Sequence, residues 1–284
     1  MVRFDAYTLT AQGVQADQLL SLLYRVGDQA FEGRGFHTFG SRVSVKAADG
    51  DEVGYVQWGG KQEGRVMLEV KGARTPEVVE AVRAKYPHRC TRVDSCADFD
   101  APGAFERVLG AVLDAKRDHR LYGESRGDWD DFPELGRTQY LGAATSPVKL
   151  RLYEKGKQPE YRHLNRADWC RLEIQVRPQK EAKQAYAALS ALDVWGASKW
   201  TRQLAAHVLA EHVDPHPPGT VWKASERDRK LQWMLKQYGP ALVSLADDCG
   251  GWDVMGLTLR EMLQAMKSGA ADAPTTARGL GEPQ

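Results

Sequence analysis

The 284-residue chain has few cysteines, almost no net charge and no long hydrophobic run. Its four cysteines form no C-x-x-C pair, which favours reduced, buried thiols in a cytoplasmic protein over a zinc site or a disulfide framework. No stretch approaches the roughly 18 apolar residues of a membrane span, and the start of the chain does not resemble a signal peptide. We therefore expect a cytoplasmic protein without a membrane partner.

The small net charge of +1 hides two regions of opposite sign. Residues 94–134 contain eleven Asp or Glu against five Lys or Arg, whereas residues 145–180 contain nine Lys or Arg against four acids. A basic stretch that follows an acidic one suits a phosphate-binding groove beside a metal site. The chain as a whole lacks the positive charge of a nonspecific polyanion binder.

The hydrophobic pattern predicts an α+β fold with a central, mostly antiparallel or mixed sheet, flanking helices and a C-terminal helical region. Strands are expected over 3–10, three times between 41 and 72, and around Arg92, Tyr140, Tyr153 and Glu173. Helices are expected over 17–31, 75–86 and 103–121, with a polar loop over 122–136. No internal repeat is visible in the sequence.

Three of the expected strands are apolar on one face and polar on the other, because side chains alternate along a strand. The first, 148–155, places one tyrosine among three cations: Lys149, Arg151, Tyr153 and Lys155. The second, 169–177, has the polar positions Arg171, Glu173, Gln175 and Arg177. The third, 92–99, has Arg92, Asp94, Cys96 and Asp98. If these strands are neighbours, three carboxylates converge near Tyr153.

A tyrosine held among cations is suited to attack a phosphodiester. Phenol has a pKa near ~10, and flanking cations favour the phenolate and the approach of a phosphate. A hard divalent cation on two or three carboxylates would polarise the scissile phosphate. Ordinary structural roles remain open: an exposed packing tyrosine, a solvated Lys155 before Gly156, and surface salt bridges from the acids to Arg92 or Arg171.

Four short segments, in this order, resemble the replication initiation factor (Rep_trans) family, which includes rolling-circle initiators of small plasmids and filamentous phages. The segments are Arg92-Val93-Asp94 through Asp98-Phe99, Tyr140-Leu141-Gly142, Arg151 to Gly156, and Arg171 to Gln175. The resemblance covers roughly residues 1–250. The chain has no H-x-H pair, which the histidine-dependent class of nickases requires.

The resemblance implies a metal-dependent enzyme that nicks and rejoins origin DNA through a covalent 5′-phosphotyrosyl intermediate. It implies Tyr153 as the nucleophile, with Arg151 and Lys155 assisting phosphate binding. It assigns Mg²⁺ or Mn²⁺ to Asp94 and Glu173 and leaves Asp98 open as a third ligand. The implied partners are double- and single-stranded origin DNA, a host helicase and a host polymerase, and a homodimer stays open.

The pattern changes after Pro178, where helical segments replace the half-polar strands. We predict a catalytic nicking domain over 1–180, a helical region over 181–267 and a disordered tail over 268–284. Four tryptophans are expected to pack between the helices: Trp195, Trp200, Trp222 and Trp233. Five basic residues are expected to contact DNA: Lys149, Arg171, Arg177, Arg227 and Lys230.

Two functions of other kinds compete with this interpretation. A non-catalytic DNA-binding regulator with the same fold would bind DNA and leave it intact. A metal-dependent hydrolytic nuclease would use Tyr153 only to position its substrate, and it would release free 5′ phosphate ends without a protein–DNA adduct.

Overall fold

The computed structural model describes residues 1–219 and 226–267, and the chain divides into two compact units, Met1–Val221 and Trp222–Gln284. The boundary predicted at residue 180 is too early. The segment that follows residue 180 packs on the sheet, where Trp195 and Trp200 are buried in the same core as the strands. The predicted tail over 268–284, together with Trp222, lies outside the described residues.

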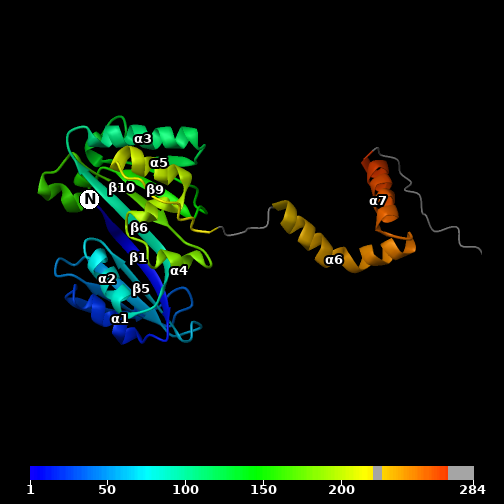
Figure 1. Cartoon of the computed structure of the whole chain (residues 1–284), viewed down its shortest axis with the longest axis horizontal. Coiled ribbons are helices and arrows are strands. Elements are labelled where there is room, and N and C mark those ends of the chain that lie inside the picture. Colours follow the sequence, from blue (N-terminus) through cyan, green and yellow to red (C-terminus); the bar gives the residue numbers. More distant parts are fainter. Residues whose placement is uncertain (220–225, 268–284) are drawn as a thin grey trace, which may run out of the picture. The chain divides into compact units, whose positions relative to one another are not determined.

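All ten strands of the first unit form one antiparallel sheet, so the predicted α+β class is confirmed (Figure 1). The strand order is β2-β3-β4-β5-β1-β6-β10-β9-β8-β7. The strands are β1 (Val2–Gln12), β2 (Gln29–Arg34), β3 (Ser41–Lys46), β4 (Glu52–Trp58), β5 (Arg65–Lys71), β6 (Arg89–Asp100), β7 (Gly123–Gly127), β8 (Arg137–Leu141), β9 (Val148–Tyr153) and β10 (Trp169–Val176).

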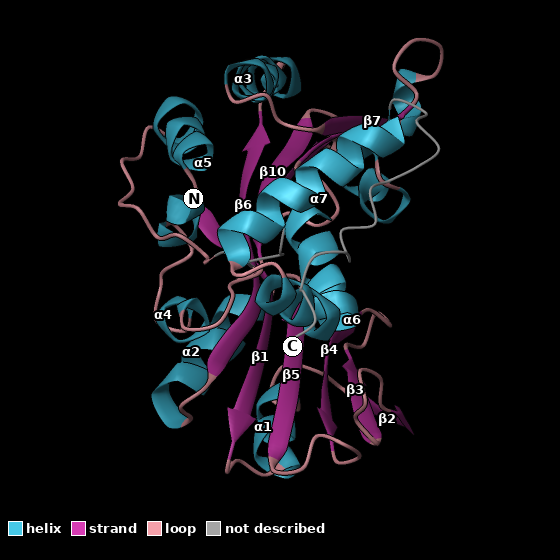
Figure 2. Cartoon of the chain, turned by 90° about the vertical axis from the view of Figure 1, so that its right-hand side faces the viewer, coloured by secondary structure: helices cyan, strands magenta, loops and turns pink. Residues whose placement is uncertain are grey.

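Five α-helices accompany the sheet: α1 and α2 lie beside β1 and β5, α3 lies against β9 and β10, and α5 packs against α3 (Figure 1 and Figure 2). They are α1 (Ala16–Leu23), α2 (Thr75–Lys85), α3 (Ala104–Asp118), α4 (Ala182–Tyr186) and α5 (Lys199–Leu204). Short 3-10 turns lie at η1 (Pro133–Leu135), η2 (Lys155–Lys157), η3 (Pro159–Leu164) and η4 (Asp193–Ala197), and a π turn lies at η5 (Ala205–Leu209).

The helices bury one face of the sheet, and the alternation of the strands explains which one. On β6, Val93 packs in the core, and Ser95 on the same side accepts a hydrogen bond of 3.0 Å from the indole of Trp195. Leu172 and Ile174 on β10 are also fully buried there. The opposite face, which carries Arg92, Asp94 and their neighbours on adjacent strands, is called the polar face below.

The sheet is a structural duplication. The order strand, helix, four strands, helix occurs over residues 2–85 (the first half) and again over 89–186 (the second half). From the centre outward, the strands read β1-β5-β4-β3-β2 in the first half and β6-β10-β9-β8-β7 in the second. Because β1 and β6 pair antiparallel, the halves are related by an approximate two-fold axis perpendicular to the sheet.

Both edge strands differ from the sequence-based prediction. The helix expected over 17–31 ends at Leu23, and β2 follows it. The loop expected over 122–136 contains β7. Every residue of β2 and all but the first of β7 are exposed, so neither strand has an apolar face to reveal it.

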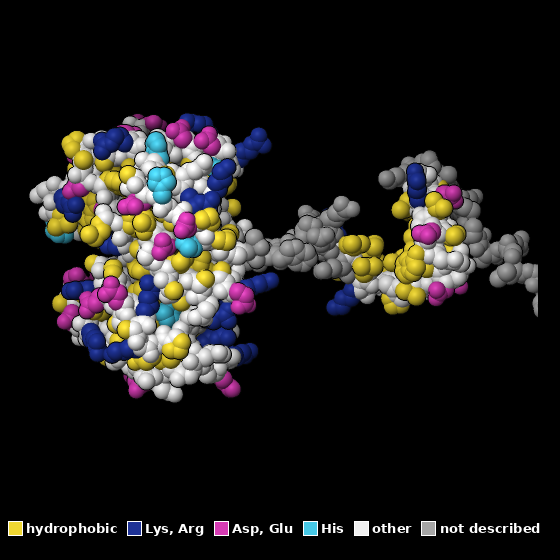
Figure 3. All heavy atoms as spheres, viewed as in Figure 1, with side chains coloured by type: hydrophobic (Ala, Val, Ile, Leu, Met, Phe, Trp, Pro, Cys, Tyr) yellow, Lys and Arg dark blue, Asp and Glu magenta, His cyan; other side chains and the backbone are white. Residues whose placement is uncertain are grey.

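The second unit consists of α6 (Glu226–Asp248) and α7 (Trp252–Lys267), which contact each other. Trp233 is 62% exposed, so the prediction that it packs between helices is wrong, whereas Trp195 and Trp200 are buried as expected. No helix in the described part of the chain is long and apolar enough to cross a membrane. On the face that Figure 3 shows, acidic and basic side chains are interspersed over the first unit, as the small net charge suggests.

Candidate active site on the polar face

The three half-polar strands are neighbours in the sheet, in the order β6-β10-β9. Glu173 lies opposite Cys96 on one side and Arg151 on the other. Arg171, two residues away, lies opposite Asp98 and Tyr153. Directly opposite residues point to the same face of a sheet, so the predicted site residues of these strands are brought together on the polar face.

Tyr153 is the last residue of β9 and is only 6% exposed. The guanidinium of Arg151 lies 5.0 Å from the centre of its ring, and the ammonium of Lys155 lies 5.9 Å away. Burial, followed by the charge of Glu173, raises the pKa of Tyr153 above that of a free phenol, although Arg171 and Arg151 oppose the shift. For this phenol to act as a nucleophile, its surroundings would have to change so that it becomes exposed and ionised.

Lys155 lies in a cage of three aromatic rings. The strand ends at Tyr153, so Lys155 belongs to the turn η2 and not to β9 as predicted. Its ammonium lies 4.3 Å from the ring centre of Tyr161, 5.3 Å from that of Trp169 and 5.9 Å from that of Tyr153. Burial, together with the charge of Arg171, lowers the pKa of Lys155 to about 8. Neutral lysine is therefore accessible near physiological pH.

Gly156 allows the β9–β10 connection to close over this cage. A Cβ atom at Gly156 would lie 1.7 Å from the carbonyl oxygen of Arg166. A side chain cannot fit there unless the backbone moves. The glycine that follows Lys155 in the sequence thus has a steric role in placing the cage.

Arg171 and Asp98 form a buried ion-pair network. The guanidinium of Arg171 donates to both carboxylate oxygens of Asp98, at 2.7 and 2.9 Å, and to Asp5 at 2.5 Å. Asp98 also accepts hydrogen bonds from Trp169 at 3.0 Å and Arg3 at 2.8 Å. Burial would raise the pKa of Asp98, but these hydrogen bonds, led by that of Arg171, lower it to about 2.

The other two acids each face one arginine. Asp94 accepts a hydrogen bond of 2.9 Å from Nε of Arg92 and a second from its Nη2. Glu173 accepts one of 2.9 Å from Arg151. Burial raises the pKa of Glu173 to about 7; Arg151 opposes this shift, and the charges of Asp94 and Asp5 add to it.

The donor set fits a divalent cation at Asp94 and Glu173 better than at Asp98. Burial is the main cause of the raised pKa of Glu173, and the charges of Asp94 and Asp5 add to it, so a cation bound here would favour the ionised carboxylate. The oxygens of Asp98 are engaged by four donors from three residues, which leaves no free lone pair aimed at a metal. The described residues contain no group of three or more His, Cys, Asp or Glu with metal-binding geometry. Mg²⁺ usually keeps several waters, so an ion held by two carboxylates would be hydrated.

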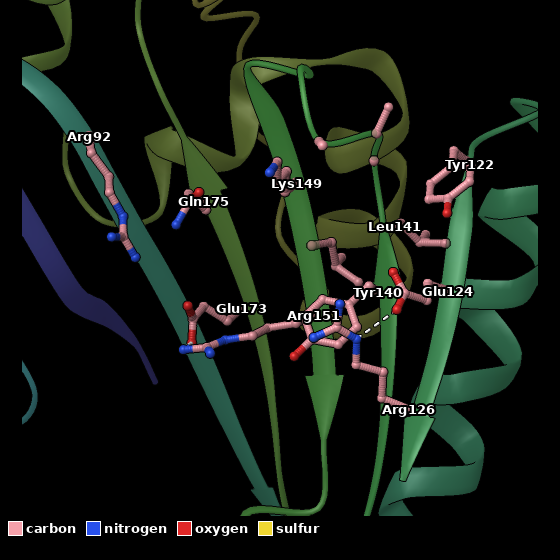
Figure 4. Close-up of a pocket in the computed structure, with 14 residues that line it drawn as sticks. Arg92, Tyr122, Glu124, Arg126, Tyr140, Leu141, Lys149, Arg151, Glu173 and Gln175 are labelled. Atoms are coloured by element: carbon pink, nitrogen blue, oxygen red, sulfur yellow. Dashed lines mark hydrogen bonds and ion pairs between the residues drawn. The ribbon is translucent and has the colours of Figure 1, made fainter.

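A groove of about 460 Å³ opens on the polar face beside these residues (Figure 4). Arg92, Lys149 and Arg151 line it together with Glu173. From the edge of the sheet come Tyr122, Glu124, Arg126 and Tyr140. The guanidinium of Arg126 lies 5.2 Å from the ring centre of Tyr140. This mixture of cations and aromatic rings is typical of a surface that binds a phosphate backbone.

The remaining predicted DNA-binding residues are distributed between the two units. Arg177 follows β10 and is exposed. Lys230 is exposed on α6, in the second unit. Arg227 also lies on α6, and its side chain is outside the described residues. Within the first unit, Lys149 lies opposite Gln175 and Arg171 lies opposite Tyr153, so both belong to the polar face.

Sequence reasoning missed Asp5, Tyr161 and Trp169 as members of the site. Asp5 reaches the polar face because the β1–β6 register shifts between Phe4 and Ala6, and no sequence signal marks that bulge. Tyr161 in η3 and Trp169 at the start of β10 both precede Arg171 and form part of the cage around Lys155. The aromatic residues that follow Lys155 were the available clue to this cage.

No family model matches the chain, and no curated protein matches it. Among solved structures, the chain is similar to one titled as a rolling circle replication initiator protein from Geobacillus stearothermophilus, with 18% identity and a TM-score of 0.48. That match covers 81% of this chain and 91% of the other.

Proposed function

We propose that the protein is a metal-dependent DNA nicking and rejoining enzyme that initiates rolling-circle replication and forms a covalent 5′-phosphotyrosyl intermediate. The observation that supports this function best is the placement of Tyr153 among Arg151, Lys155 and Arg171, beside the Asp94–Glu173 pair of acids. A structural tyrosine would not require this concentration of buried charge, since each buried ion has a desolvation cost.

In the proposed reaction, the phenolic oxygen of Tyr153 attacks phosphorus and the bond from phosphorus to the 3′ oxygen breaks. The leaving 3′ oxygen takes a proton from solvent, so the products are a 5′-phosphotyrosyl bond and a 3′ hydroxyl. The reverse attack by a 3′ hydroxyl reseals the strand and releases the tyrosine. Neutral Lys155, with its pKa of about 8, accepts the phenolic proton. Arg151 and the resulting Lys155 ammonium then neutralise charge on the phosphate.

Asp94 and Glu173 are the proposed ligands of Mg²⁺ or Mn²⁺. Such an ion would polarise the scissile phosphate. Arg151 must release Glu173 for this, and a phosphate is a suitable alternative partner for its guanidinium. We therefore expect Asp94→Ala and Glu173→Ala to lower cleavage and weaken its dependence on the metal concentration without unfolding the protein. Cleavage equal to wild type at limiting Mg²⁺ would exclude that residue as a ligand.

The test uses a supercoiled plasmid that carries the DNA flanking the coding sequence, incubated with the full chain and Mg²⁺ or Mn²⁺. Denaturing gels should show nicked circles and a protein–DNA adduct, and mass spectrometry of the digested adduct should locate the nucleotide on Tyr153. Nicks with free 5′ phosphates and no adduct would support the hydrolytic nuclease instead. Binding without nicks would support the regulator.

The proposed function also implies partners and a cellular location. Origin DNA in double- and single-stranded form, a host helicase and a host polymerase are the partners of a cytoplasmic initiator encoded by a plasmid or filamentous phage. A second copy of the chain stays open as an additional partner.

A further inference from the structure

The first half of the sheet carries a second cluster of aromatic and basic side chains on the polar face, away from Tyr153. Phe31, Ser44, Tyr55 and Glu69 lie directly opposite one another on β2, β3, β4 and β5, so they share a face. Thr8 continues the row on β1 and lies opposite Arg92 of the second half. The row therefore ends on the polar face already described.

Two phenylalanines of this cluster are exposed and each is paired with a cation. Phe31 is 46% exposed, and the ammonium of Lys46 lies 5.1 Å from its ring centre. Phe36 is 36% exposed, and the guanidinium of Arg42 lies 5.5 Å from its ring centre and 5.3 Å from that of Tyr55. Exposed rings beside cations can stack bases while the cations neutralise phosphates.

The Phe36 ring is held in place before any ligand arrives. Its backbone N–H donates a 2.7 Å hydrogen bond to the buried side chain of Gln57, and its ring packs edge-on against Tyr55 at 5.3 Å. The next residues, His37 and Thr38, both have left-handed backbones, with φ of 54° and 71°. Two adjacent non-glycine residues in this conformation carry strain, which the contacts around the loop must offset.

The cluster also has unused hydrogen-bonding capacity. In the described part of the chain, Nε of Arg42 and the hydroxyl of Ser44 are buried without a hydrogen-bond partner. Ser44 is 2% exposed. Buried polar atoms normally have a partner, so these two are candidates to bind a ligand that reaches between Phe31 and Phe36.

We propose that this surface, formed by Phe31, Phe36, Arg42, Ser44 and Lys46, binds single-stranded DNA. Bases stack on the two phenylalanine rings, and Arg42 and Lys46 contact the backbone phosphates. Ser44 supplies a hydroxyl to the same segment. The choice of DNA as the ligand rests on the proposed nicking function. The aromatic and basic character of the surface is observed independently of that function.

The test is fluorescence anisotropy of a labelled oligothymidylate with the full-length chain, in EDTA and at one fixed salt concentration. Phe31→Ala and Phe36→Ala should each weaken binding about tenfold, because each removes a stacking ring. Phe31→Trp should bind like wild type, because it keeps an aromatic ring at this position. Lys46→Gln should weaken binding less and flatten its salt dependence.

Tyr24→Ala is the matched control, since Tyr24 is an exposed ring at the end of α1, a helix that packs on the helical side of β4 and β5. It should bind like wild type. Wild-type affinity in both Phe31→Ala and Phe36→Ala, with unchanged circular dichroism, would overturn the proposal. The proposal would also be overturned if the only effect of these substitutions were the loss of a dimer in sedimentation. That result would assign the surface to contacts with a second copy of the chain.

The same binding measured with Tyr153→Phe separates this surface from the proposed chemistry. Oligothymidylate binding that persists in Tyr153→Phe and falls in Phe31→Ala supports the surface even if no nicking is found. If wild type nicks DNA and forms an adduct, but Phe31→Ala and Phe36→Ala bind oligothymidylate as well as wild type, the proposed nicking reaction is supported. The proposed single-stranded DNA surface is then rejected.

Discussion

Glu69 and Glu173 occupy equivalent places in the two halves of the sheet, and different kinds of donor hold them. Glu69 accepts hydrogen bonds from two hydroxyls, Tyr55 at 3.0 Å and Thr8 at 3.1 Å. Glu173 faces the guanidinium of Arg151 at the position where the first half has Tyr55. Neutral donors satisfy a carboxylate locally, whereas a guanidinium among further acids builds a charged centre.

The position of Tyr153 differs in the same way. Tyr153 lies opposite Arg171, and the equivalent Gln57 lies opposite Met67. Gln57 is fully buried and accepts the hydrogen bond that fixes the loop before β3. The duplication thus repeats the scaffold without repeating the chemistry: the second half concentrates buried charge around a tyrosine, and the first half presents exposed rings.

The sharpest contrast between the halves is expected from removing one hydroxyl in each. Tyr153→Phe should lower nicking by at least ~10³-fold, because only this oxygen forms the covalent bond. Tyr55→Phe should leave nicking intact and cost about 1 kcal/mol of stability through the lost hydrogen bond to Glu69. Adduct formation by Tyr153→Phe would move the nucleophile elsewhere, first to Tyr140, which lines the groove, and then to Tyr161.

Truncation should show that the second half of the sheet requires residues after 180 in order to fold. A fragment of residues 1–219 should fold and nick single-stranded DNA, whereas a fragment of residues 1–180 should not fold. The shorter one lacks Val194 and Trp195, which are fully buried in the core of the second half. Thermal unfolding of the two fragments is the measurement, and a cooperative transition in the shorter one would contradict the expectation.

Substituting one carboxylate in each half should separate charged from neutral networks. Asp98→Ala should cost about 3 kcal/mol in urea unfolding, since Arg171 stays buried and keeps only Asp5 as an ionic partner. Glu69→Ala should cost about 1 to 2 kcal/mol, because it strands only the hydroxyls of Thr8 and Tyr55. Equal costs would show that the two networks do not differ as their donors suggest.

Acid should weaken the second half through Asp98. Its pKa is about 2 in the folded chain against a usual value of 3.8, so the folded state favours the ionised form. The resulting stability, about 2 kcal/mol, is present above pH ~4 and is lost as the pH falls towards 2. Unfolding free energies of wild type and Asp98→Asn, compared between pH 5 and 2.5, isolate this contribution. A difference that does not shrink over that range would argue against it.

A glycine substitution tests the connection that closes over the Lys155 cage. Gly156→Ala should cost about 1 to 3 kcal/mol, because its Cβ would overlap the Arg166 carbonyl. The control Gly110→Ala places a Cβ in open space within α3 and should be neutral or slightly stabilising. Thermal melts compare the two, and a stable Gly156→Ala would mean that the connection between β9 and β10 moves easily.

The alternation of residues determined much of the second half of the sheet. It placed Lys149, Arg151 and Tyr153 on one side of β9 and Glu173 on the same side of β10, because a strand leaves each side chain only two directions. It failed at β2 and β7, since edge strands exposed on both faces show no alternation. The predicted boundary at residue 180 failed because burial of Trp195 depends on contacts distant in sequence.

By itself, then, the sequence determined the α+β class, the three half-polar strands and the residues on their polar sides. Only the tertiary structure decided that these strands are neighbours, that Asp5 joins them through a bulge, and that Asp98 is committed to Arg171. Only the tertiary structure showed that the sheet is duplicated. The first half presents exposed aromatic rings, and the second half contains buried charged side chains. The physical reason is that strand order, register and burial are set by pairings between segments far apart in the chain, which local patterns do not encode.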